Sequence, residues 1–132
     1  MSAWVHVSAI ARIDYIQILN DDNEVDFDKV FGRECLWEDD SSVWERARTH
    51  EEEFLPMGSE GSLQKSVWVN PDDHCAARYT VSIFGDLRDV ESGKWIIDWF
   101  KEKLRKMRVR QASITINSEY YGISTWTYGG DD

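Results

Sequence analysis

Apolar and polar positions alternate in two stretches of the segment 77–117, and a helical pattern lies between them. In residues 78–84, Val81 and Ile83 fall on one side of an extended chain, and the position before each of them is polar. A period of two is typical of a strand that buries one face. Residues 111–117 show the same alternation. Both stretches are therefore predicted to be strands of one sheet.

Residues 95–107, between these strands, carry apolar side chains at the spacing of one helical stripe. The stripe consists of Ile96, Phe100, Leu104 and Met107. Acidic residues precede the segment and basic residues end it, which matches the sign of a helix dipole at each end. A helix is therefore predicted here. It should begin between Asp89 and Ser92, either of which can cap its first turn.

The N-terminal part of the chain predicts a strand and a short helix. Residues 3–13 are apolar on both faces, which is typical of a strand in the interior of a sheet. Phe27 and its apolar neighbours suggest a short helix after a polar turn. Asp26 or Asn23 can cap this helix, and Gly32 is expected to end it.

The pattern is weaker between the short helix and residue 62. Ser42 and Glu45 occupy the two positions of a capping box, in which each side chain bonds to a main-chain amide of the other residue. Apolar residues then recur at helical spacing. A helix over residues 43–55, stopped by Pro56, is the prediction for this stretch.

The remaining strands complete the sheet. Residues 63–70 and a strand from residue 76 onward should form a hairpin across a polar turn, and residues 123–128 a last strand. Strand, helical region, strand, strand, helix and strand is the element order of two split βαβ units. We therefore predict an α+β, ferredoxin-like fold: an antiparallel sheet with helices on one face, an acidic insertion at about 20–62 after the first strand, and an extra C-terminal strand.

Length and charge limit the possible classes of protein. A chain of 132 residues predicts a single domain over residues 1–132. No stretch approaches the roughly 18 apolar residues of a membrane span, and the N-terminus lacks the pattern of a secretion signal, so we expect a cytoplasmic protein without a membrane contact. The net charge of −10 argues against direct binding to nucleic acid. Cys35 and Cys75 are expected to be reduced thiols.

The negative charge is concentrated in one part of the chain. Residues 21–60 hold fourteen acids against four bases, whereas residues 101–110 hold six bases against one acid. One interpretation is a solvated surface that keeps the protein soluble. The other is an acidic face that binds a basic surface of a partner protein. The candidate residues of this acidic face are Asp39, Asp40, Glu51, Glu52 and Glu53.

Seven tryptophans in a chain of this length are the second unusual feature. If helices cover one face of the sheet, several aromatic side chains are expected on the other face. Tryptophan and tyrosine contribute strongly to protein interfaces, so an aromatic sheet face is a candidate binding surface. Its predicted members are Trp4, Trp68, Trp126 and Tyr128. The alternative is that the insertion covers this face.

No motif supports catalysis. The acids, histidine and cysteine of residues 72–75 are adjacent on a turn, and the acidic loop from Asp21 lacks the spacing of a calcium loop. We expect no metal site and no cofactor. The sequence favours a non-enzymatic protein-binding module, such as an acidic inhibitor or a nucleic-acid mimic, that acts on a basic partner. The alternative is a small-molecule or nucleotide-binding domain that uses aromatic stacking.

Overall fold

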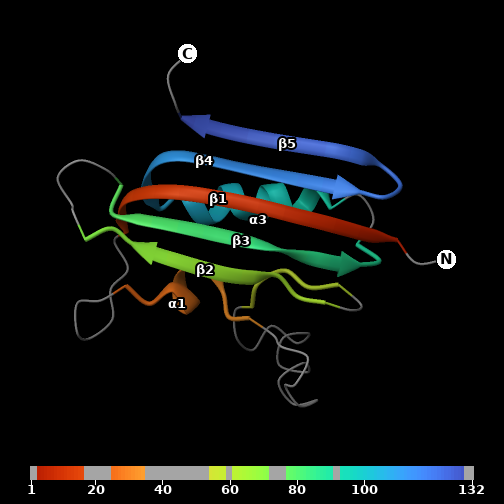
Figure 1. The fold of residues 1–132 in the computed structure, drawn as a ribbon, viewed down its shortest axis with the longest axis horizontal. Coiled ribbons are helices and arrows are strands. Elements are labelled where there is room, and N and C mark those ends of the chain that lie inside the picture. The colour runs from red at the N-terminus through yellow and green to blue at the C-terminus, as the bar shows by residue number, and fades with distance from the viewer. Residues whose placement is uncertain are drawn as a thin grey trace.

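In a computed structural model, most of the described residues belong to one sheet and two helices (Figure 1). The structure describes residues 3–16, 25–34, 54–58, 61–71, 77–90 and 93–129.

The sheet has five strands, and every neighbouring pair is antiparallel. Its order is β2-β3-β1-β4-β5, so β1 lies at the centre, and β2 and β5 form the two edges. This confirms the prediction that the first strand is internal, and also the hairpin of β2 and β3. The strands are β1 (Trp4–Ile16), β2 (Gln64–Val69), β3 (Tyr79–Arg88), β4 (Met107–Ser118) and β5 (Gly122–Gly129).

Two helices of the described residues accompany the sheet, and one of them is short. The long helix, α3 (Lys94–Leu104), crosses behind the sheet in Figure 1, and the short helix, α1 (Phe27–Phe31), lies near the β2 edge. No helix of the described residues covers the face that is turned toward the reader. The molecule is therefore an open, mostly-β sheet of the broad α+β class.

The core lies between the sheet and α3. Alternate residues of β1, beginning with Val5, are buried, and they share this face with Ile83 of β3 and Ile114 of β4. Ile96, Phe100 and Leu104 close the core from α3, as the helical stripe predicted. The alternation of apolar residues is thus sufficient to define which face of each central strand is buried.

Helix α1 begins and ends where the sequence predicted. The Asp26 carboxylate accepts hydrogen bonds from the main-chain amides of Asp28 at 3.1 Å and Lys29 at 3.3 Å. These bonds satisfy two amides that a helix leaves without partners in its first turn. Gly32 ends the helix with a φ of 118°.

Helix α3 begins later than predicted. Its N-cap is Gly93, which has a φ of 74° and no side chain to cap the first turn. The predicted N-cap was a residue between Asp89 and Ser92. The left-handed conformation and the close approach of Val5 and Ile116 require glycine here. The geometry of the turn therefore determines where the helix starts, and side-chain capping does not.

The strand after α3 begins earlier than predicted. Met107 was assigned to the helical stripe, but it opens β4 and pairs with Ile16 at the end of β1. The alternation of Met107 and Val109 with basic residues accounts for this strand start. The predicted helix over 43–55 lies outside the described residues, apart from its last two positions.

Candidate functional site

The acidic face predicted from the sequence lies outside the described residues, and so do Cys35 and Cys75. Its five acids all fall within residues 35–53, which the structure does not describe. The described residues carry thirteen lysines and arginines against nine acids, although the whole chain has a net charge of −10. The sheet and helices are therefore basic, and the excess of acids belongs to the connecting segments and the chain ends.

The predicted aromatic face is wrong as a single surface, because the sheet register divides its four members between both faces. Trp4 pairs with Arg88 and Trp68 with Thr80, on the face that α3 leaves open. Trp126 pairs instead with Ile114, a buried residue of the face that α3 covers, and Tyr128 follows on the same side. The four residues predicted to form one aromatic face are Trp4, Trp68, Trp126 and Tyr128.

The two tryptophans on the open face also lie far from each other. Their partners on β3, Thr80 and Arg88, are eight residues apart, which corresponds to roughly 26 Å along a strand. Trp68 is 55% exposed and sits near the outer edge of the sheet. Trp4 and Trp68 therefore cannot contact one ring-sized ligand together.

Polar cross-strand pairs occupy much of the open face. His6 Nδ1 lies 2.7 Å from Asp86 Oδ1, and the Arg12 guanidinium donates a hydrogen bond of 3.0 Å to Gln111 Oε1. Small hydroxyl side chains such as Ser8 lie between these pairs. Such pairs are exposed and contribute little to stability, so they mainly give this face its wetted, polar character.

The opposite face has a groove beside the end of α3, which we call the aromatic groove. It has a volume of about 320 Å³. The rings of Trp126 and Tyr128 stack at 6.2 Å between centroids with an interplanar angle of 21°, and Phe100 meets Trp126 edge-on at 6.3 Å. The aromatic groove is lined by Lys101, Leu104, Arg105, Met107, Val109, Trp126 and Tyr128.

Cations lie beside these rings. Lys101 Nζ is 5.7 Å from the centre of the Trp126 ring, within the range of a cation–π interaction. Arg105 bonds to Glu102 at 3.0 Å on the same side of the helix. The aromatic groove therefore combines π surface with positive charge, which suits a flat or anionic group.

Strand β5 itself is a second candidate site, because it forms an edge of the sheet that no other described strand covers. Its eight residues contain no charged side chain and no proline. Ile123 is 68% exposed and Tyr128 is 52% exposed. Within the described part of the chain, β4 is the only strand that pairs with β5.

The other edge, β2, is covered in part. The main-chain amide of Lys65 donates to Glu34 Oε1 at 3.0 Å, and the Lys65 ammonium bonds to Asp28 and to the carbonyl oxygen of Gly32. The residues around α1 therefore satisfy β2 groups that would otherwise face outward. Among the described residues, no hydrogen bond or ion pair from outside the sheet reaches β5 in this way.

Comparison with known proteins does not assign the chain to a family. No protein family, no curated protein and no solved structure matches this chain. Among the described residues there is no group of three metal-binding side chains and no helix that could span a membrane. The candidate sites therefore rest on their own geometry.

The sequence contains a pattern that indicates the aromatic groove. This pattern is missed when the alternation of residues 123–128 is counted from Ile123. In residues 123–128, Trp126 and Tyr128 alternate with Thr125 and Thr127, so the two rings share a face. Ile123 lies on the opposite face and is exposed. The alternation shows that the two rings share a face, and the register of β5 against β4 decides that this is the face that α3 covers.

Proposed function

We propose that the protein is a non-enzymatic protein-binding module that receives an extended segment of a partner along β5. One observation carries the proposal: β5 is a long, uncharged and exposed edge strand. An edge strand presents unpaired amide and carbonyl groups that can pair with another chain. A partner strand would extend the sheet beyond β5.

The contrast with β2 supports a functional reason for this edge. Soluble proteins protect sheet edges with charged side chains, proline or a covering segment. β2 carries Lys65 and is contacted by Glu34, whereas β5 has none of these protections among the described residues. An unprotected edge of this length favours aggregation unless a partner covers it. A binding role explains why β5 carries no charged residue.

The acidic connecting segments suit a basic partner in this proposal. Asp39, Asp40 and Glu51 to Glu53 would attract a partner with a basic surface and raise its association rate, while β5 supplies the lasting contact. An inhibitor of a nucleic-acid-handling protein, which mimics the charge of nucleic acid, is the extreme form of this role. Such a protein would act in the cytoplasm, without direct contact to nucleic acid or membrane.

The aromatic groove favours a second candidate function, a small-molecule or nucleotide-binding domain. Trp126 and Tyr128 offer stacked rings, and Lys101 lies next to them. Bases and other flat rings stack on such side chains, and a nearby cation favours an anionic substituent. In this role the protein would bind a ligand with one ring and negative charge.

The finer fold class is also a proposal. The order β2-β3-β1-β4, with all neighbours antiparallel and α3 between β3 and β4, supports a ferredoxin-like sheet to which β5 has been added at the β4 edge. In that arrangement α1 stands in the element order where the first crossover helix is expected. The added strand then replaces β4 as the edge available to a partner.

Charges introduced on β5 should weaken partner binding. A partner isolated from the source cells with the wild-type chain is purified, and its affinity is measured for a variant with Thr125→Lys and Thr127→Lys. Both side chains lie on the open face of β5, away from the aromatic groove. Lysines on an edge strand oppose sheet extension, so we expect the affinity to fall by about tenfold or more.

The matched control carries the same two charges at the other edge. Gln64→Lys and Ser66→Lys lie on the same face, in β2, at the same spacing. They repel a basic partner equally at long range, so only the local effect on the edge differs between the two variants. Equal weakening in both variants would contradict docking on β5, and full affinity in the β5 variant would do so as well.

A further inference from the structure

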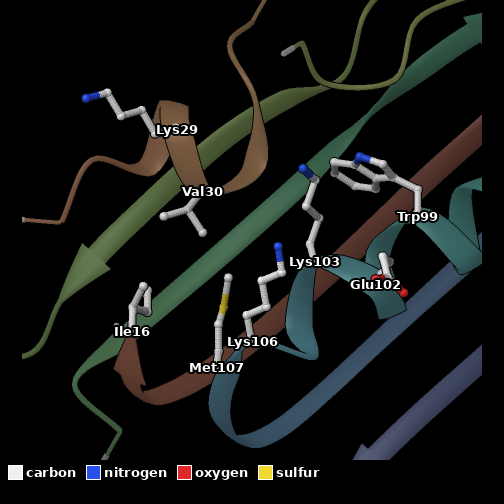
Figure 2. A pocket seen from close by; sticks show the side chains of 8 residues that line it. All are labelled: Ile16, Lys29, Val30, Trp99, Glu102, Lys103, Lys106 and Met107. Atoms are coloured by element: carbon white, nitrogen blue, oxygen red, sulfur yellow. The ribbon is translucent and has the colours of Figure 1, made fainter. Parts of the chain in front are cut away.

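A cavity of about 300 Å³ lies between α1 and the end of α3, next to the last residue of β1 (Figure 2). It is separate from the aromatic groove and from β5. Its lining residues come from three segments that are distant in sequence. They are Ile16, Lys29, Val30, Trp99, Glu102, Lys103, Lys106 and Met107.

One side of the cavity is apolar. Ile16 and Val30 are buried, and Met107 extends its thioether toward the space between them in Figure 2. The Trp99 ring forms a wall at the other end, beside the Lys103 side chain. Apolar and aromatic walls with a few polar groups are typical of sites for small molecules.

The polar groups of the cavity are mostly cationic. Among the described residues, three lysines and one carboxylate line it, and that carboxylate, Glu102, bonds to Arg105 at 3.0 Å. Figure 2 shows Lys103 and Lys106 extending from the end of the helix toward the cavity. Among described residues, Lys29 and Lys106 form no ion pair. The described lining thus carries more positive than negative side chains, in a protein with a net charge of −10.

The two neighbouring ammonium groups are crowded. Burial lowers the pKa of Lys103 below its usual value, and the positive charge of Lys106 lowers it further. An anion placed between the two groups would reverse the second effect, because an opposite charge stabilises the protonated amine. Bound anion and cavity are therefore complementary in charge.

We propose that this cavity binds a small organic anion. Its carboxylate or phosphate head lies between Lys103 and Lys106, and its flat apolar body lies against Trp99, Met107 and the buried wall. The volume is at the lower end of the range for ligand sites, so the body is one ring system and not an extended chain. This site is independent of the β5 edge and of any partner protein.

Four compounds test both parts of the ligand on the full-length protein by titration calorimetry. Naphthoate and naphthyl phosphate have the ring and a charged head, naphthylmethanol has the ring without charge, and acetate has a charged head without the ring. We expect one equivalent of naphthoate or naphthyl phosphate to bind, and the tighter of the two identifies the head group. Naphthylmethanol and acetate should bind at least about tenfold more weakly.

Three variants locate the binding. Lys106→Gln should weaken binding of the preferred anion by about tenfold, because it removes one charge-assisted contact. Lys94→Gln removes the same charge from the first turn of α3, outside the cavity, and should change the affinity by less than about twofold. Trp99→Leu should reduce the affinity for the preferred anion toward that of acetate. Circular dichroism melting of each variant shows that it is folded before its affinity is compared.

Several results would overturn the proposal. They are no binding of either aromatic anion, equal affinity for naphthoate and naphthylmethanol, and equal losses in Lys106→Gln and Lys94→Gln. A fourth is binding that survives both Lys106→Gln and Trp99→Leu but is lost in Tyr128→Leu. That outcome would assign the ligand to the aromatic groove.

Discussion

Replacing Phe100 by alanine is expected to lower the free energy of unfolding by about 3–5 kcal/mol. Phe100 has no exposed surface, and it meets the Trp126 ring edge-on at 6.3 Å. It also belongs to the core cluster that joins α3 to the buried face of the central strands. Removal of the ring leaves a cavity in the centre of this cluster. A loss of this size is a large part of the stability of an ordinary domain.

Trp95→Ala provides the control on the same helix. Trp95 is 47% exposed and lies outside the core cluster, so its removal should cost less than about 1 kcal/mol. Urea unfolding followed by circular dichroism measures both variants against wild type. Equal unfolding midpoints for Phe100→Ala and wild type would contradict the position of α3 on the sheet.

Replacing Gly93 by alanine is expected to have the second large effect, a loss of about 3 kcal/mol. The residue has a φ of 74°, which costs any residue with a Cβ about 1–2 kcal/mol. A Cβ here would also lie 2.9 Å from Ile116 Cγ2 and 3.0 Å from Val5 Cγ1. Both neighbours are buried in the core and have little room to move, so overpacking adds to the backbone strain.

Gly122→Ala separates these two causes. Gly122 has a φ of 78°, close to that of Gly93, but a Cβ there would meet no atom within 4 Å. Its substitution should therefore cost only the backbone strain, about 1–2 kcal/mol. Thermal unfolding by calorimetry compares the two variants. Equal losses would mean that the turn before α3 does not pack against Val5 and Ile116 as described.

The central elements could be predicted from the sequence because their side chains alternate between core and solvent. Val81 and Ile83 define the buried face of β3, and Ile96 with Phe100 defines that of α3. In these elements local pattern and tertiary burial agree. The Asp26 cap of α1 was predictable for a similar reason, since it depends only on residues within one turn.

The candidate sites could not be predicted in the same way. The face on which Trp126 and Tyr128 lie depends on the register of β5 against β4, and the edge position of β5 depends on the order of the whole sheet. Both are long-range properties that no local pattern contains. The cavity at Lys103 and Lys106 likewise requires α1 to lie opposite the end of α3. The positive charge near residue 106 was evident from the sequence, but the cavity beside these lysines was not.

Amide hydrogen exchange of the free protein and of its complex with an isolated partner tests the proposal of docking on β5 most directly. Exchange is followed separately for β5 and β2, the two edges of the sheet. Sheet extension converts outward-facing amides of β5 into hydrogen-bonded ones, so their exchange should slow by at least about tenfold, while that of β2 should be unchanged. Unchanged exchange throughout β5 in a saturated complex would contradict the proposed function.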